Sequence, residues 1–219
     1  MSDVYVAADT VPIDPERPLL IVDADEVLLR FVAGLEAFLE RKGLVLNLSS
    51  YRLHGNVRVR ATGEAVLDIE VTALLEEFRS ELDNLEAVEH ADAALAELSP
   101  LMQIVVLSNV DPHQAPARLR NLERLRWHLP LLCNAGPKGP AIAALARRAA
   151  PPAFFVDDIS SHHRSAADHA PAVIRIHLVG DNRLKPLLPP APEAHLRAED
   201  WREVSAFIRA QLARQAQTL

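Results

Sequence analysis

The sequence predicts an α/β protein with a doubly wound parallel sheet and an inserted, mainly helical domain. From residue 101 onward, short apolar runs alternate with stretches of helical periodicity, a rhythm typical of parallel sheets covered by helices on both faces. A further apolar run, Leu19–Val22, lies upstream, and a polar, helix-rich stretch separates it from the others. We therefore expect this run to belong to the same sheet and the stretch after it to be an insertion.

The expected strands are short and almost wholly apolar. Leu19–Val22 stands between Pro18 and acidic residues, and four consecutive apolar side chains favour a strand buried on both faces. The same pattern predicts strands at residues 101–107, 131–133, 153–156 and 173–178.

Helices are expected where apolar residues recur every three or four positions. The first covers residues 27–41 and ends before Gly43. Asp111 is expected to cap the helix that follows strand 101–107, with Pro112 at its first position. Further helices are predicted at 66–83, 85–98, 139–150, 160–170 and 199–217.

The 219 residues amount to about one and a half domains of roughly 150 residues each. We place a core domain at residues 1–29 and 96–219 and an inserted domain at 30–95. Within the insertion, residues 44–65 are polar, and the segment NVRVRATG predicts a short hairpin.

Composition excludes several classes of protein. With 23 basic and 30 acidic residues the formal charge is −7, which is a poor match for nucleic acid. Cys133 is the one cysteine, so an intrachain disulfide and a Cys-based zinc site are excluded, and we expect it to be a small buried hydrophobe. The longest apolar runs are far shorter than the ~18 residues of a membrane span, and the first residues lack the pattern of a signal peptide. We expect a soluble, cytoplasmic protein without nucleic-acid or membrane partners, and composition leaves its oligomeric state open.

Polar side chains follow the predicted strands. Ligands of open parallel sheets bind outside the carboxyl ends of the strands, so these side chains are expected to gather at one edge. Carboxylates crowded at such an edge repel one another unless a cation lies among them, and oxygen ligands favour Mg²⁺. The set consists of Asp23, Asp25, Ser108, Asn109, Lys138, Asp157 and Asp158.

Each residue type in the set has a use in phosphate chemistry. Ser108 and Asn109 can donate hydrogen bonds to phosphate oxygens, and Lys138 supplies a positive charge for the same anion. An aspartate can act as a covalent nucleophile, and a second acid two residues later can protonate a leaving oxygen and then activate water. Taken singly, the aspartates can also be turn or helix-capping residues, and Lys138 a surface lysine. Their joint occurrence at successive strand ends favours the catalytic interpretation.

Four ordered segments carry a family resemblance: LLIVDADEV, IVVLSN, the lysine of GPKGPAIAAL, and FFVDDISSH. Together they resemble the four motifs of the haloacid dehalogenase-like (HAD) hydrolase superfamily. The resemblance spans residues 19–158 and implies a Rossmann-like core. It also implies that Asp23 attacks phosphorus to form an aspartyl-phosphate, that Asp25 is the general acid and base, and that Ser108 and Lys138 bind the phosphoryl group.

The resemblance further implies a Mg²⁺ site and a cap domain. The ion would be held by the Asp23 carboxylate, the Asp25 backbone carbonyl and Asp158, with Asp157 supporting or sharing ligation. The insertion at 30–95 would correspond to a mobile cap between the first and second motifs, which excludes water and selects substrates.

Two positions depart from the family pattern. Glu26 stands where many phosphatases of this superfamily have glycine, and a carboxylate there is expected to alter selectivity. The fourth motif lacks a further aspartate four residues on, where this chain has Ser161 and His162. We expect His162 and His163 to have loop or surface roles.

Arg52 and His54, in a polar cluster of the insertion, are candidate substrate contacts; the alternative is a solvated hairpin face. The leading hypothesis is a Mg²⁺-dependent phosphatase for a small phosphorylated metabolite. A dehalogenase would need neither metal nor Asp25, whereas a phosphotransferase or mutase with the same aspartyl-phosphate stays open. A receiver-like signalling module shares these residue types but places its acidic pair first, and a non-enzymatic phosphate-binding protein would have no need of Asp25.

Overall fold

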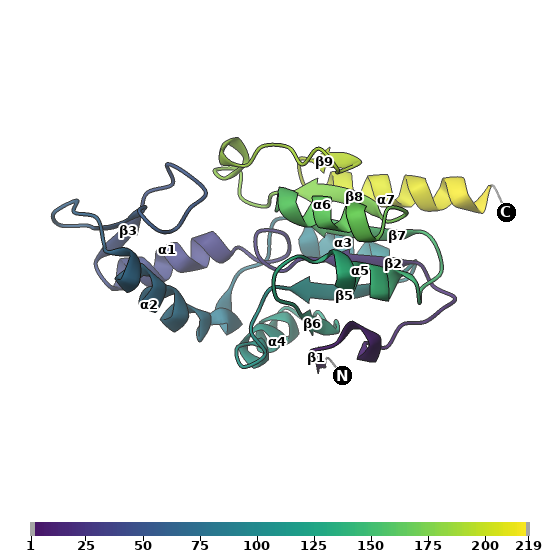
Figure 1. Cartoon of the computed structure of the whole chain (residues 1–219), viewed down its shortest axis with the longest axis horizontal. Coiled ribbons are helices and arrows are strands. Elements are labelled where there is room, and N and C mark those ends of the chain that lie inside the picture. Colours follow the sequence, from purple (N-terminus) through teal and green to yellow (C-terminus); the bar gives the residue numbers. More distant parts are fainter. Residues whose placement is uncertain (1–2, 218–219) are drawn as a thin grey trace.

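The computed structural model describes residues 3–217 and contains a seven-stranded sheet in which neighbouring strands are parallel (Figure 1). The predicted doubly wound parallel sheet is therefore confirmed. In spatial order the strands are β1 (Val4–Tyr5), β6 (Leu131–Cys133), β5 (Gln103–Ser108), β2 (Leu19–Val22), β7 (Ala153–Asp157), β8 (Ile174–Leu178) and β9 (Leu196–Ala198).

Strand β2 lies at the centre of the sheet and is completely buried, as its four apolar residues predict. Val22 is in register with Val106 of β5 on one side and Val156 of β7 on the other. The carboxyl ends of these three strands therefore meet at one edge. Side chains of β2 alternate between two apolar clusters, with Leu20 in one and Ile21 in the other.

Helices cover both faces of the sheet, as predicted. The cluster on one face includes α5 (Gly139–Ala146) and α6 (Ser160–His169), which also contact each other. The cluster on the other face includes α3 (Ala91–Leu98), α4 (Ala115–Arg124) and α7 (Trp201–Ala216). Short 3₁₀ turns, Ala8–Thr10, Leu82–Asn84 and Lys185–Leu187, lie in the connections.

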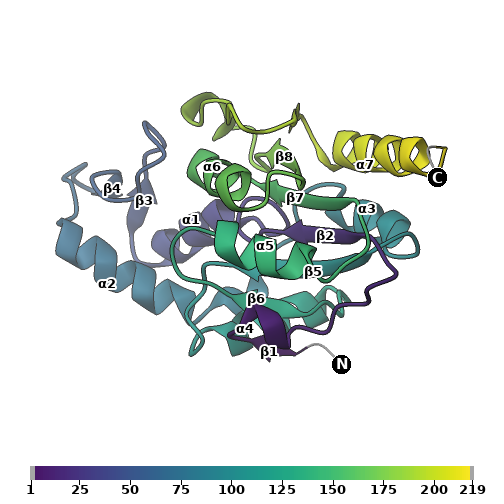
Figure 2. The same ribbon diagram turned by 45° about the vertical axis from the view of Figure 1, so that its right-hand side comes forward.

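Residues 31–84, called the insertion below, extend beyond the carboxyl ends of the central strands (Figures 1 and 2). They comprise α1 (Phe31–Arg41), an antiparallel pair of strands, β3 (Leu44–Leu46) and β4 (Val57–Val59), and α2 (Asp68–Arg79). The Phe78 ring packs against Phe31 and Phe38, with centroids 5.2 and 5.4 Å away, so α1 and α2 share a small aromatic core.

Helix α3, part of which we expected in the inserted domain, lies with the core. It contacts α7, and the indole Nε1 of Trp127 donates to the Asp92 carboxylate at 2.9 Å. The helix predicted at 85–98 begins only at Ala91. Before it, the N–H of Val88 donates to the carbonyl of Leu28 at 2.8 Å, and Glu89 and His90 form a turn that leads into the helix.

The helix predicted at 27–41 begins at Phe31, four residues late. Residues 24–29 instead form a tight loop, in which the N–H groups of Leu28 and Leu29 both donate to the carbonyl of Ala24. Glu26 takes a left-handed backbone conformation in this loop, with a φ of 56°.

The expected Asp111 cap and Pro112 start were also wrong, because α4 begins at Ala115. The Asp111 carboxylate accepts from the N–H of His113 and so closes a turn before the helix. None of the helices in residues 3–217 is both long and apolar enough to cross a membrane.

Candidate active site

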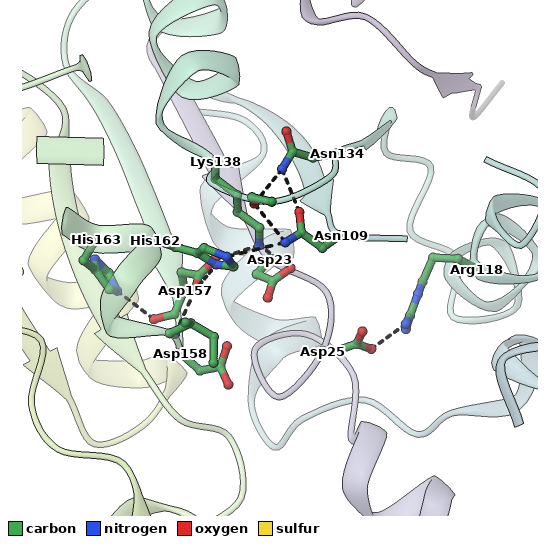
Figure 3. Close-up of polar contacts among 12 residues, drawn as sticks. Asp23, Asp25, Asn109, Arg118, Asn134, Lys138, Asp157, Asp158, His162 and His163 are labelled. Atoms are coloured by element: carbon green, nitrogen blue, oxygen red, sulfur yellow. Dashed lines mark hydrogen bonds and ion pairs between the residues drawn. The ribbon is translucent and has the colours of Figure 1, made fainter. Parts of the chain in front are cut away.

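Lys138 links the ends of two neighbouring strands. It precedes α5 and is completely buried, and its Nζ lies 2.7 Å from Asp23 Oδ1 and 2.7 Å from Asp157 Oδ2 (Figure 3). Asp23 follows β2, and Asp157 ends β7. The parallel register therefore brings together three residues that are far apart in the sequence.

The approach of α5 to the site depends on a glycine. A Cβ added to Gly139 would lie 2.1 Å from the backbone oxygen of Ser165 in α6. The N–H of Gly139 donates to the Ser165 hydroxyl at 3.0 Å. This close contact fixes the start of α5 and with it the position of Lys138.

Asp23, Asp157 and Asp158 form a buried cluster in which one carboxylate oxygen from each lies within 4.8 Å of the others. Burial raises the pKa of Asp23 to about 6, although Lys138 opposes the shift. Burial, reinforced by the Asp157 and Asp23 carboxylates, raises the pKa of Asp158 well above its ordinary value.

Asp157 and Lys138 form the charged pair of the cluster. Burial alone would raise the pKa of Asp157, but the charge of Lys138 and a hydrogen bond from His162 outweigh it and lower the pKa. Burial would lower the pKa of Lys138, but the two carboxylates outweigh it and raise the pKa.

This donor set fits a divalent cation. Lys138 brings one positive charge against the carboxylates of Asp23, Asp157 and Asp158, and burial together with repulsion from the other two carboxylates raises the pKa of Asp158. Hard cations such as Mg²⁺ bind carboxylate oxygens and relieve that repulsion.

Asp25 lies at the same edge but turns away from the cluster. Its carboxylate forms an ion pair with Nη2 of Arg118, from α4 (Figure 3). Arg118 is completely buried, and its Nε and Nη1 have no hydrogen-bond partner among the residues that the structure describes. Sequence reasoning missed Arg118, because an arginine in the polar segment ARLRNLERL resembles a solvated helix face.

Histidine side chains contact the carboxylate or the backbone carbonyls of Asp157 and Asp158. The surface or loop roles expected for His162 and His163 were therefore wrong. His162 Nδ1 lies 3.1 Å from Asp157 Oδ1, and His163 Nε2 donates to the Asp157 carbonyl at 2.9 Å. His177 Nε2 donates to the Asp158 carbonyl at 2.9 Å. Burial lowers the pKa of His163 to about 4, so this ring is neutral at pH 7. The reason is that α6 begins at Ser160, soon after the acidic pair, so that His162 and His163 in its first turn lie against Asp157.

Ser108 is the last residue of β5, the strand that pairs with β2, and Asn109 follows it. Ser108 is buried, whereas Asn109 is exposed and its side chain is held by hydrogen bonds. Asn109 Nδ2 donates to the carbonyl of Gly136 at 3.0 Å, and Asn109 Oδ1 accepts from Asn134 Nδ2 at 2.7 Å.

The insertion reaches the cluster through Tyr51. Its hydroxyl donates to Asp158 Oδ2 at 2.8 Å. Arg52 and His54 are exposed, and His54 Nε2 lies 3.0 Å from the hydroxyl of Thr72 on α2. The structure places neither side chain in the acidic cluster, and their role as substrate contacts stays a prediction. The aromatic ring of Tyr51 beside polar neighbours was the signal that could have singled it out.

Comparison with solved structures identifies the architecture. An L-2-haloacid dehalogenase superposes with a TM-score of 0.60 at 16% identity, covering 88% of this chain and 99% of the other. The chain has the haloacid dehalogenase-like fold. Scans of protein-family models and of curated proteins gave no match for the sequence.

Two other hydrolases share the haloacid dehalogenase-like fold. The HAD hydrolase YfnB from Bacillus subtilis, in a structure with bound magnesium, has a TM-score of 0.59 at 12% identity, with 88% and 99% of the two chains covered. A HAD family hydrolase from Deinococcus radiodurans, with bound phosphate and sodium, has a TM-score of 0.57 at 16% identity, with 91% and 98% covered.

Proposed function

We propose that the chain is a Mg²⁺-dependent phosphatase that hydrolyses a small phosphate monoester through an aspartyl-phosphate on Asp23. The observation that carries the proposal is the buried cluster of Asp23, Asp157 and Asp158 with Lys138 between two of its members. Proteins of the same fold have been solved with magnesium or with phosphate bound, which supports both the ion and the substrate class.

In the first step, a carboxylate oxygen of Asp23 attacks phosphorus, and the bond from phosphorus to the leaving oxygen breaks. Asp25 donates a proton to that oxygen, after turning from Arg118 toward the cluster. In the second step, Asp25 accepts a proton from water, the water oxygen bonds to phosphorus, and the Asp23–phosphorus bond breaks. Asp23 and inorganic phosphate are thereby released.

Lys138 and Ser108 stabilise the negative charge of the transferred phosphoryl group. Lys138 acts without reorganisation, because its ammonium is already held by the two aspartates. Mg²⁺, held by Asp23 and Asp158 with Asp157 beside them, would neutralise phosphate charge and orient the group for attack.

A dehalogenase is the competing function on this fold. It would use Asp23 to attack carbon and would have no use for Asp158 as a further buried carboxylate beside Asp23 and Asp157. The acidic cluster therefore favours phosphoryl chemistry. Transfer to a second substrate instead of water, as in a mutase, would use the same intermediate.

The test is phosphate release from a panel of small esters and para-nitrophenyl phosphate, with Mg²⁺ and with chelator. We expect metal-dependent turnover that is lost in Asp23→Asn and retained in the control Asp168→Asn, which changes an exposed aspartate of α6. Halide release from 2-haloacids without phosphate release from any ester would overturn the proposal.

A further inference from the structure

A small, mostly apolar cavity lies between the acidic edge of the core and the insertion. Its volume is about 190 Å³, enough for about six water-sized groups. Two of its lining residues, Asp25 and Tyr51, also border the acidic site, since Tyr51 donates to Asp158. The cavity thus adjoins the proposed general acid, and most of its other lining residues, including Phe31, Leu48 and Leu53, belong to the insertion.

Glu26 is one of the residues that line this cavity, and its carboxylate has a hydrogen-bond partner on one oxygen only. The residue is 2% exposed, and its Oε1 accepts from the N–H of Val32 at the start of α1 at 2.7 Å. Its Oε2 is buried and has no hydrogen-bond partner within residues 3–217. A buried oxygen left without a partner is unfavourable, so a donor from a bound molecule would stabilise it.

The other walls of the cavity suit the body of a small organic cation. Phe31 and Tyr51 supply aromatic rings, whose faces attract positive charge. Leu48, Leu53 and Leu184 supply aliphatic surface for methylene groups.

We propose that this cavity holds the alcohol part of the substrate and that Glu26 selects phosphate esters whose alcohol part carries a positively charged amine. The inference rests on the proposed phosphatase function and names its substrate class. An ammonium group would donate to Glu26 Oε2 while its chain packs against the leucines. The size of the cavity limits that chain to a few carbon atoms.

Local charge favours an amine over a neutral hydroxyl. Burial raises the pKa of Glu26 to about 7; the Asp181 and Asp25 carboxylates add to the rise, and the N–H of Val32 and the charge of Arg183 oppose it. Asp25 is paired with Arg118 and Asp181 with Arg183. Glu26 itself has no ion-pair partner among the described residues. A cationic ligand would supply the missing charge, and a hydrogen bond between two charged groups is stronger than one to a hydroxyl.

The experiment compares isosteric esters that differ in one charged group. The probes are 2-aminoethyl phosphate against n-propyl phosphate, and 3-aminopropyl phosphate against n-butyl phosphate, in each case with ammonium replaced by methyl. For the wild-type chain with Mg²⁺ we expect kcat/KM to favour the amine by about tenfold or more, a difference of about 1.4 kcal/mol.

Glu26→Gln keeps the side-chain shape and removes the charge. We expect it to reduce the amine preference to within about threefold, because the charged contact with the amine is lost. Glu123→Gln, on an exposed position of α4, is the matched control and should keep the full preference. Should Glu26→Gln fail to fold, Phe31→Leu removes an aromatic face and is expected to lower the preference in the same direction.

A binding measurement separates the two proposals. Titration calorimetry of Asp23→Asn with 2-aminoethyl phosphate and n-propyl phosphate reports the preference without turnover. Hydrolysis of para-nitrophenyl phosphate with no amine preference in rate or binding would overturn the inference and leave the phosphatase proposal intact. Preferential amine binding with no phosphate release from any ester by the wild type would overturn the phosphatase proposal and leave the cavity assignment.

Discussion

The guanidinium of Arg118 is completely buried and holds the carboxylate of Asp25 turned away from Asp23. Two of its nitrogens have no hydrogen-bond partner in the described part of the chain. The unpaired nitrogens cost some stability, and the ion pair holds the Asp25 carboxylate in one position. Arg118 is thus a positioning residue for the proposed general acid.

Replacing Arg118 with methionine tests this role. We expect some loss of stability but a retained fold, because the Asp25 side chain that loses its partner is 36% exposed and can be hydrated, and because the substitution also removes unpaired buried N–H groups. We expect kcat to fall by about tenfold with little change in KM, since general acid–base catalysis is worth about 10²–10⁴-fold and only its positioning is lost. Steady-state kinetics with a pH profile checks this, and an unchanged kcat would remove Arg118 from the catalytic account.

Lys138→Met is expected to destabilise the protein by about 3–5 kcal/mol, because two buried carboxylates, Asp23 and Asp157, lose their shared partner. Denaturant unfolding measures the change. Lys42→Met is the control: Lys42 pairs with the exposed Glu77, and a surface ion pair contributes less than about 1 kcal/mol. Equal effects of the two substitutions would show that the Lys138 contacts add nothing beyond a surface pair.

Mg²⁺ is expected to raise the melting temperature of the wild-type chain. A ligand at 100 times its Kd stabilises the folded state by about 2.7 kcal/mol. Asp158→Asn should abolish most of the increment, and Asp168→Asn should retain it. Thermal unfolding at a series of Mg²⁺ concentrations provides the measurement, and an increment that survives in Asp158→Asn would place the ion elsewhere.

Arg183 ties a loop of the core to the insertion. Its guanidinium bonds the Asp181 carboxylate and donates from Nη1 to Glu36 of α1 at 2.9 Å. Burial alone would raise the pKa of Asp181, but the hydrogen bonds from Arg183 outweigh it and lower the pKa from the ordinary 3.8. The resulting stability is fully present above pH 3.8 and is lost as pH falls through the lowered pKa.

Arg183→Gln should therefore destabilise the protein by about 1 kcal/mol at pH 7, since the arginine is half exposed. The difference from wild type should shrink as pH falls below 3.8, where Asp181 becomes protonated in both proteins. Urea unfolding at several pH values checks the prediction. A difference that stays constant down to pH 2.5 would contradict it.

Much of the fold could be predicted because the central strands consist of apolar runs. Leu19–Val22 and Leu131–Cys133 have the predicted bounds. Parallel strands that are buried on both faces consist almost entirely of apolar residues, so they can be recognised from the sequence. The edge strands β1 and β9 were not predicted, since they are only two and three residues long and lack an apolar run. Their pairing depends on neighbours already in place.

The gathering of Asp23, Lys138, Asp157 and Asp158 could be predicted because parallel strands end at one edge, whatever their distance in the sequence. The direction of Asp25 could not, because it depends on Arg118, which becomes buried only when α4 packs on the sheet. Local periodicity describes one element at a time, whereas such a contact depends on how two elements meet.

The hydrogen bond from Tyr51 to Asp158 makes the insertion and the acidic cluster thermodynamically dependent on each other. Whatever changes the charge or the ligation of Asp158 changes the free energy of holding Tyr51 against it. Linkage is reciprocal, so the position of the insertion must alter affinity at the acidic cluster by the same amount. Tyr51 and Asp158 are more than a hundred residues apart in the sequence. Through this one hydrogen bond, ligand occupancy at the acidic cluster and the position of the insertion therefore affect each other.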